Sequence, residues 1–309
     1  MALRIAVMGS GGVGGYFGAR LAQGGADVTF VARGAHLAAM RANGLRIDSK
    51  TTPLHVKPVK VVESAADAGT VDVVMFCVKM ADTASAAAQI KPLVDNGATV
   101  FTFQNGVESA DQVGAVVGAK NVVAGTAQIA AVISEPGVIR HTGTMARMVF
   151  GEPDGKPSPR TEAFLAACKA CGFDCVLSDD ITRAVWMKFA MLAPFSAMTT
   201  LTRGPIGPVR TSPQARRLLE AAIAEVVAVG AKLGKHLTAE DAGRTLKLID
   251  GMPAEMMASM THDLLAGKPL EVNGLSGAVA RLGEANGVPV PTNRFIADAL
   301  SVHAEGKKG

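Results

Sequence analysis

The sequence predicts an α/β domain with a doubly wound, largely parallel sheet, followed by an all-helical domain. Strand-like and helix-like segments alternate through the first half, and residues 71–78 form a nearly unbroken apolar run, as in strands covered on both faces. A glycine cluster directly follows the first strand. From residue 180 onward almost every segment has helical period. We therefore place the domains at residues 1–179 and 180–309.

The individual elements follow from short apolar runs and from helical spacing. Strands are predicted at residues 4–8, 27–32, 45–47, 54–62, 71–78, 99–103, 122–130, 138–141, 148–150 and 174–177. Helices of the first domain are predicted at residues 13–23, 36–43, 81–93 and 161–171. Helices of the second domain are predicted at residues 181–201, 214–233, 239–248, 254–265, 275–286 and 293–303.

Composition excludes several classes of protein. The chain has 309 residues, 49% hydrophobic and 19% charged, which suits a large buried core and excludes disorder and low complexity. Its net charge of +4 is spread along the chain, so we expect no nucleic-acid partner. No apolar run approaches the roughly 18 residues of a membrane span, so we expect no membrane association.

Cysteine usage indicates a reducing compartment and no metal site. Four cysteines in a chain of this length do not form a disulfide framework, so we expect a cytoplasmic location. Cys168, Cys171 and Cys175 have a spacing that superficially suggests metal ligands. Structural zinc needs four Cys or His ligands, and no histidine lies nearby in the sequence, so we predict no metal.

The glycine cluster matches a phosphate-binding loop. Its residues fit the pattern G-x-G-x-x-G and stand between a predicted strand and a predicted helix: Gly9, Ser10, Gly11, Gly12, Val13 and Gly14. Gly9 permits a tight turn, Gly11 lets the backbone approach a pyrophosphate, and Gly14 lets the helix pack on the strand. The helix N-terminus supplies N–H groups and a positive dipole. This context predicts a Rossmann-type dinucleotide site.

Arg33 favours NADPH over NADH. A site specific for NAD places Asp or Glu at the end of the second strand, about 20 residues after the glycines. Asp27 comes too early, and Arg33 occupies that position. A planar, permanently charged guanidinium suits the 2′-phosphate of NADP. A solvated arginine on a loop is the alternative.

Four polar residues are candidates for chemistry. Three of them, Lys188, Glu271 and Asn105, also have a plain structural explanation, which for Asn105 is an Asn-Gly turn. Lys188 lies in a very apolar helix, where it either extends to water or acts as a proton donor with a lowered pKa. Glu271 stands where a carboxylate commonly faces a helix dipole. Asn105 and Lys79 follow strands at their carboxyl ends, where ligands bind in open parallel sheets.

Together these residues resemble the ketopantoate reductase (2-dehydropantoate 2-reductase) family over essentially the whole chain. The family-like segments occur in the expected order: the GSGGVG loop, Arg33, Cys77-Val78-Lys79, Gln104-Asn105-Gly106, Pro136-Gly137, Trp186-x-Lys188, Ser259-Met260 and Glu271. Each segment is short, but their order and spacing make the resemblance specific.

The resemblance implies NADPH-dependent reduction of a small 2-oxo acid, ketopantoate, with Lys188 as the proton donor. It implies cofactor contacts from the glycine loop, Arg33, Lys79, Asn105, Ala131 and Glu271. Substrate contacts would come from Asn105, Lys188 and Ser259, and from the positions of Leu192 and Ser196. Family members are commonly cytoplasmic dimers or monomers, so a homodimer is possible.

The chain departs from the family pattern at several usually polar positions. Asparagines one and two turns after the catalytic lysine correspond to Leu192 and Ser196. Two further asparagines correspond to Ile206 and Met256, and Asn273 stands where an acidic residue is common. Since a site that lacks polar groups cannot recognise a hydroxyl well, a more apolar 2-oxo acid or another carbonyl compound is one hypothesis. Compensation by neighbouring residues, with ketopantoate as substrate, is the other.

Two other functions deserve comparison. A non-catalytic NADP(H) sensor would have no need of the proton donor Lys188. A hydroxyisobutyrate-type dehydrogenase shares the two-domain layout and a catalytic lysine, but Arg33 and the pair of Ser259 and Glu271 fit it less well.

Overall fold

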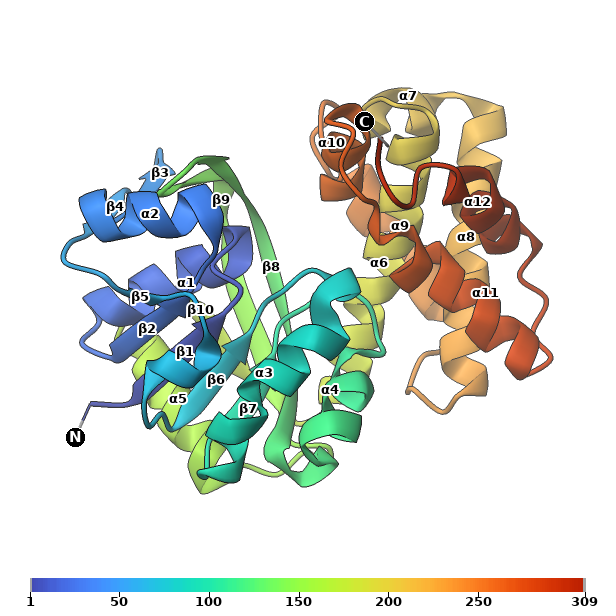
Figure 1. Cartoon of the computed structure of the whole chain (residues 1–309). Helices are drawn as coiled ribbons and strands as arrows, with labels where there is room; N and C mark the ends of the chain where they lie inside the picture. Colours follow the sequence, from blue (N-terminus) through green and yellow to red (C-terminus); the bar gives the residue numbers. More distant parts are fainter. Residues whose placement is uncertain (1, 308–309) are drawn as a thin grey trace. The chain divides into compact units, whose positions relative to one another are not determined.

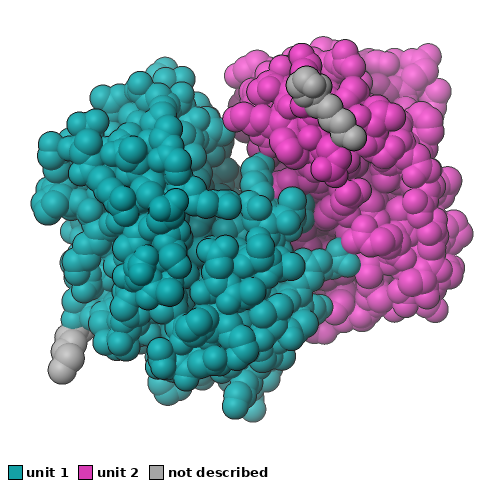
Figure 2. Space-filling model, in the orientation of Figure 1, with its two compact units in different colours: residues 1–104, 108–181 teal, residues 105–107, 182–309 magenta. Residues whose placement is uncertain are grey.

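The computed structural model describes residues 2–307 and divides them into two compact units, coloured separately in Figure 2. Unit 1 takes the residues up to 104 together with 108–181, and unit 2 takes residues 105–107 and the chain from 182 onward. The predicted boundary after residue 179 lies two residues before this division. The sequence does not predict that residues 105–107 belong to unit 2.

Unit 1 is a ten-stranded sheet with helices on both faces (Figure 1). Its strands are β1 (Arg4–Met8), β2 (Asp27–Val31), β3 (Leu45–Ser49), β4 (Leu54–Val56), β5 (Lys60–Val62), β6 (Val73–Phe76), β7 (Thr99–Thr102), β8 (Val122–Glu135), β9 (Val138–Gly151) and β10 (Asp174–Leu177). Its helices are α1 (Gly12–Gln23), α2 (Gly34–Asn43), α3 (Thr83–Asp95), α4 (Ser109–Val117) and α5 (Pro159–Lys169), with short 3-10 helices η1 (Ala65–Ala68), η2 (Met80–Asp82) and η3 (Ala119–Asn121).

The sheet is dominated by parallel pairs, as predicted. Its order is β4-β3-β9-β8-β7-β6-β1-β2-β5, with β10 paired to β9. Only β3–β4 and β8–β9 are antiparallel among the pairs of the described chain. Alternate residues of each central strand supply separate cores: Ile5 and Val7 pack on the side of α1, α2 and α5, whereas Ala6 and Met8 pack on the side of α3 and α4.

Strand register brings four loops to one edge of the sheet. Met8 at the end of β1 pairs with Val31 of β2 and Phe76 of β6, and Phe76 pairs with Thr102 of β7. The segments that follow these strands therefore leave the sheet side by side. This is the edge at which open parallel sheets bind ligands.

Several predicted elements differ from the structure. The three strands predicted between residues 122 and 150 are two 14-residue strands, β8 and β9, because their antiparallel pairing extends past Ile129 to Glu135, with register shifts between Ile129 and Ala131 and between Ile133 and Glu135. The strand predicted over residues 54–62 is broken into β4 and β5 around Pro58, which has no N–H to donate to a sheet. Helix α4 was not predicted.

Unit 2 is all-helical. After α6 (Ile181–Leu201) come α7 (Ile206–Thr211), α8 (Pro213–Lys232), α9 (Glu240–Asp250), α10 (Ser259–Leu265), η4 (Glu271–Gly274), α11 (Ser276–Ala285) and α12 (Pro291–Ser301). Helix α7 was not predicted. The helix predicted from residue 254 begins only at Ser259, because the chain makes a turn at Pro253 and Ala258 is extended.

Helix α6 is the central element of unit 2. It is the single helix of the described residues that is long and apolar enough to cross a membrane, and 61% of its most apolar window is buried inside the structure, as in a core helix. Gly230 of α8 lies so close to α6 that a Cβ there would come within 2.9 Å of the Trp186 ring. At its other end Thr200 and Thr261 join α6 to α10, their hydroxyls 3.2 Å apart.

Candidate active site

The glycine loop begins with a turn that requires glycine. Gly9 directly follows β1 and has φ +97°, and a Cβ there would lie 2.8 Å from the backbone of Cys77 and Val78. Gly11, in contrast, has open space where its side chain would be. The loop is therefore packed at its first glycine and open at its second.

The other two glycines let helix α1 sit close to the sheet. A Cβ on Gly14 would come within 2.8 Å of Val7 in β1 and would clash with the Gly9 carbonyl, as the sequence pattern predicts. A Cβ on Gly12 would clash with the carbonyl of Ala131 in β8. Ala131, predicted as a cofactor contact, thus lies directly against the loop. The buried Ser10 hydroxyl donates a hydrogen bond to the Val31 carbonyl at 2.9 Å, so the side chain of this loop residue is engaged with β2.

This loop fits the diphosphate of a dinucleotide. The N-terminus of α1 is capped by Gly11, which offers no side chain to bond the N–H groups of the first turn. The positive end of the helix dipole lies at this N-terminus, beside Gly11, where a Cβ would meet no heavy atom within 4 Å. Val13 lies in that first turn.

Arg33 and Lys79 stand at the same edge of the sheet. Arg33 caps α2, its side chain is 73% exposed, and its guanidinium lies 3.5 Å from the carboxylate of Asp82. An exposed pair of this kind contributes under about 1 kcal/mol, so the guanidinium can leave it for a phosphate. Lys79 is exposed and precedes η2.

In unit 2 three predicted residues form a hydrogen-bonded chain. The Lys188 ammonium of α6 donates to Asn105 Oδ1 at 3.1 Å, and Asn105 Nδ2 donates to Glu271 Oε2 at 3.2 Å. Asn105 is 83 residues from Lys188 and 166 residues from Glu271 in the sequence. These contacts place residues 105–107 in unit 2.

The environment of Lys188 suits a proton donor. Burial lowers the pKa of the Lys188 ammonium to about 8, and the Glu271 carboxylate opposes this shift. Near neutral pH the group is therefore charged and yet close to its pKa, which favours proton transfer. Glu271 is the first residue of the 3-10 helix η4, which precedes α11.

The remaining predicted substrate residues lie on or near α6. Leu192 is half-buried one turn after Lys188, and Ser196 is buried, its Oγ without a hydrogen-bond partner among the described residues. Ser259 is exposed at the first position of α10. The Ile206 N–H donates to the Met256 carbonyl at 3.0 Å, so these two apolar departures are neighbours, and the Ile206 side chain is buried.

Sequence reasoning missed three residues that organise these segments. Gln104 donates from Nε2 to the Val78 carbonyl and to the Thr83 hydroxyl, joining the loops after β6 and β7. Thr199 of α6 bonds the start of α10, and His36 of α2 bonds the glycine loop. Gln104 stood in a family-like motif, but the partners of Thr199 and His36 are distant in the sequence and left no local signal.

No group of three or more His, Cys, Asp or Glu that could hold a metal occurs among residues 2–307. The cysteine cluster is in unit 1, where Cys168 is buried, and a hydrogen bond involving Cys175 together with burial raises the pKa of the Cys168 thiol. Burial likewise raises the pKa of the Cys77 thiol to about 12. These thiols are therefore poor nucleophiles and poor metal ligands.

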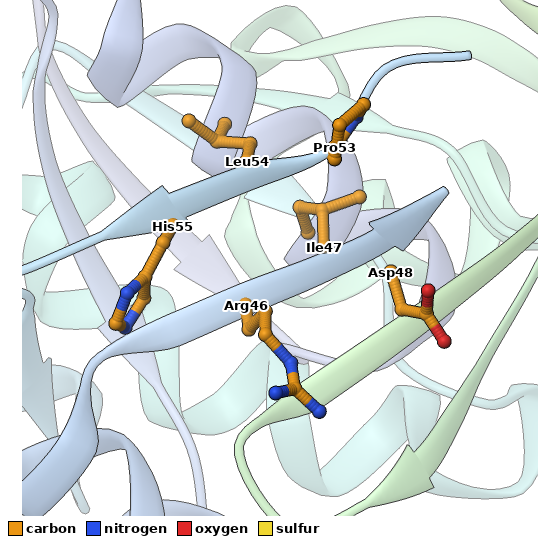
Figure 3. A pocket seen from close by; sticks show the side chains of 6 residues that line it. All are labelled: Arg46, Ile47, Asp48, Pro53, Leu54 and His55. Atoms are coloured by element: carbon orange, nitrogen blue, oxygen red, sulfur yellow. The ribbon is translucent and has the colours of Figure 1, made fainter. Parts of the chain in front are cut away.

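Two pockets of unit 1 contain none of the predicted site residues. One, of about 570 Å³, lies over β3 and β4 and is lined by Arg46, Ile47, Asp48, Pro53, Leu54 and His55 (Figure 3). Its polar groups are already engaged, Arg46 with Glu135 and Asp48 with Arg140. The other, of about 320 Å³, includes Arg20 and Arg147. Arg20 donates a hydrogen bond to the Thr52 carbonyl, and Arg147 forms an ion pair with Asp174.

Comparisons with known proteins show the family of this chain. Residues 5–155 match the family model "Ketopantoate reductase PanE/ApbA", and residues 180–304 match the model of its C-terminal part. The chain is 32% identical to a 2-dehydropantoate 2-reductase of Halobacterium salinarum over 96% of this chain and 98% of the relative. It is 31% identical to one of Mesorhizobium japonicum, over 94% of each chain.

Solved structures share the fold. A ketopantoate reductase of the PanE/ApbA family from Ralstonia eutropha superposes with a TM-score of 0.89 at 30% identity, covering 97% of this chain and 98% of that one. A D-mandelate dehydrogenase solved with NADH and anilino(oxo)acetate has a TM-score of 0.87 at 19% identity, with coverage of 97% and 98%, a likeness of fold alone. These comparisons support an oxidoreductase that acts on CH–OH groups with a nicotinamide cofactor. The chain belongs to the ketopantoate reductase family.

Proposed function

We propose that the protein is an NADPH-dependent 2-oxo acid reductase that converts ketopantoate to pantoate, with Lys188 as the proton donor. The observation that carries this proposal is the chain of hydrogen bonds from Lys188 through Asn105 to Glu271. The four cysteines form no disulfide in the structure, and such thiols are typical of enzymes in the reducing cytoplasm, which supports a cytoplasmic location.

The residues of unit 2 supply the proton and its positioning. When a ketone is reduced, negative charge develops on the carbonyl oxygen, and the Lys188 ammonium both stabilises that charge and delivers a proton to the oxygen. Asn105 Oδ1 accepts a hydrogen from Lys188 and so fixes the direction of the ammonium. Ser259 offers an exposed hydroxyl for the substrate. The bound cofactor would supply the hydride.

Arg33 supports NADPH as that cofactor. Its guanidinium is exposed at the end of β2, where the ribose of a dinucleotide lies in this fold, and its pairing with Asp82 is weak. The fold alone does not select the cofactor, since the D-mandelate dehydrogenase of the same fold was solved with NADH.

A more apolar 2-oxo acid is the second candidate substrate. Ile206 and Met256 are adjacent, Leu192 lies one turn after Lys188, and all three stand where the family usually has asparagine. A substrate hydroxyl that meets apolar groups loses hydrogen bonds to water without replacement, which costs about 1–3 kcal/mol.

The test is consumption of NADPH with ketopantoate beside 2-oxo acids of increasing, hydroxyl-free side chains. We expect turnover in the native protein and in Lys232→Ala, an exposed lysine of the same unit, and a loss of at least about a hundredfold in Lys188→Ala. Preference for a hydroxyl-free acid would select the second candidate. Binding of NADPH with no turnover of any compound would overturn the enzymatic proposal in favour of a cofactor sensor.

A further inference from the structure

His36 has no role in the proposed chemistry, yet both of its ring nitrogens bond segments around the glycine loop. Its Nδ1 accepts a hydrogen bond from the Gly137 N–H at 3.0 Å. Its Nε2 lies 3.0 Å from the Ser10 carbonyl oxygen. Because Nδ1 is an acceptor, the ring hydrogen of the neutral imidazole is on Nε2, and Nε2 donates to Ser10.

The surroundings of His36 favour this neutral ring. Burial lowers the pKa of the imidazole, and the hydrogen bond to Ser10 opposes that shift only in part. In a protonated ring both nitrogens are donors, so Nδ1 could no longer accept the hydrogen bond from the Gly137 N–H. The two bonds of His36 therefore belong to one tautomer.

These bonds join three separate segments of unit 1. Ser10 is in the glycine loop, Gly137 is in the turn between β8 and β9, and His36 lies in the first turn of α2, three residues after Arg33. The turn is held from its other side, where the Arg46 N–H donates to the Gly137 carbonyl at 2.9 Å. This accounts for the Pro136-Gly137 motif, which the proposed reaction leaves without a role.

The glycine loop thus rests against fixed partners. Ser10 is bonded through its hydroxyl to β2 and through its carbonyl to His36, and Gly12 is packed against Ala131 of β8. At Gly11, in contrast, a Cβ would meet nothing within 4 Å, so the loop is open to a ligand there.

We propose that His36 is a positioning residue that holds the glycine loop in the form that binds the diphosphate of a nicotinamide dinucleotide. The inference rests on the proposed cofactor. NADPH and NADH share the diphosphate and differ only in the 2′-phosphate, so His36 supports the binding of both, whereas Arg33 supports the binding of NADPH alone.

The test is the dissociation constant of NADPH and of NADH, measured by titration calorimetry on folded protein. For His36→Leu we expect both constants to rise about tenfold and their ratio to stay unchanged, because two hydrogen bonds to the loop are lost. For Arg33→Ala we expect only the NADPH constant to rise. His55→Leu is the matched control, since its ring also bonds a backbone carbonyl, that of Asn43 at the other end of α2.

His36→Gln provides the conservative variant, because its side-chain amide keeps a donor and an acceptor, and we expect it to recover most of the affinity for both dinucleotides. If the native protein bound neither dinucleotide, the proposed cofactor would be wrong. If the native protein bound them and His36→Leu bound them equally well, or lost only NADPH, the positioning role alone would be wrong. Should His36→Leu fail to fold, His36→Asn must weaken both constants, and native affinity in that variant would refute the role.

Discussion

The pKa of Lys188 is the property on which the chemistry depends. The side chain has one amide partner, Asn105, and burial makes its charged form less stable than in water. A pKa lowered from 10.5 to about 8 corresponds to roughly 3 kcal/mol of lost charge stabilisation. Because the charged form of Lys188 is destabilised in the resting protein, the ammonium gives up its proton more readily during the reaction.

The pH dependence of turnover follows from this shift. A proton donor must be protonated, so we expect kcat to be highest below pH 8 and to fall as the pH rises through about 8. Because the Glu271 carboxylate raises the pKa of Lys188, Glu271→Gln should move this decline to lower pH. Profiles of kcat at saturating NADPH and substrate measure both effects.

Glu255→Gln is the control for that experiment, because Glu255 is exposed on the loop before α10. Its profile should match that of the native protein. A decline that stays in place in Glu271→Gln would show that the titrating group is not Lys188.

The Thr199 hydroxyl fixes the position of helix α10 against helix α6. Its hydroxyl accepts from Thr261 at 2.8 Å and from the Ala258 N–H at 3.4 Å, and donates to the Phe195 carbonyl at 2.9 Å. Ala258 precedes Ser259, and Thr199 is on the same helix as Lys188. The hydroxyl of Thr199 therefore sets where Ser259 lies relative to Lys188.

Thr199→Val should weaken substrate binding without changing the proton donor. It leaves the Ala258 N–H unpaired, which costs about 1–3 kcal/mol, and we expect KM for the 2-oxo acid to rise about tenfold. The kcat profile against pH should stay unchanged, Thr199→Ser should restore KM, and Thr202→Val should change it little, because the exposed Thr202 hydroxyl donates only to the Met198 carbonyl of its own segment. Steady-state kinetics decide this, and an unchanged KM in Thr199→Val would remove the positioning role.

Asp241 joins α9 to α6 by a buried ion pair. Its carboxylate is fully buried, accepts from both terminal nitrogens of Arg183 at 2.8 and 2.9 Å, and accepts from the Thr238 N–H. These bonds, those of Arg183 first, hold the pKa of Asp241 well below its usual range. Their stabilisation is therefore complete above about pH 4 and is lost as the pH falls through the lowered pKa.

Asp241→Ala should lower the free energy of unfolding of unit 2 by about 2–4 kcal/mol, because it removes the buried carboxylate that bonds both terminal nitrogens of Arg183. Urea unfolding followed by the fluorescence of Trp186, the single tryptophan, reports on this unit. Asp298→Ala removes only an exposed carboxylate 3.5 Å from Arg294 and should cost less than about 0.5 kcal/mol. Equal losses in the two variants would contradict the account.

At the scale of the whole molecule, the sequence predicts best where local pattern and tertiary structure agree. The β1 strand, the glycine turn and α1 combine an apolar run with a steric need for glycine at Gly9 and Gly14, so the pattern and the cause coincide. Helix α6 was predicted with its observed ends, because its apolar face is continuous.

What the sequence does not predict depends on distant partners. The β8–β9 pair extends past Ile129 to Glu135, despite two shifts in register, because each strand satisfies the backbone of the other, which is a property of the pair and not of either segment alone. The contact of Asn105 with Lys188 and Glu271 links positions 83 and 166 residues apart, and only the family resemblance suggested it. Neither a local sequence pattern nor the family resemblance indicates the hydrogen bonds of His36 and Thr199.

The central claim is that this chain reduces a 2-oxo acid with Lys188 as the proton donor. The most direct measurement compares native protein and Lys188→Ala for both the dissociation constant of NADPH and the turnover of ketopantoate. We expect equal NADPH binding in the two proteins and a loss of turnover of at least about a hundredfold in the variant. Turnover that survives the substitution would contradict the claim.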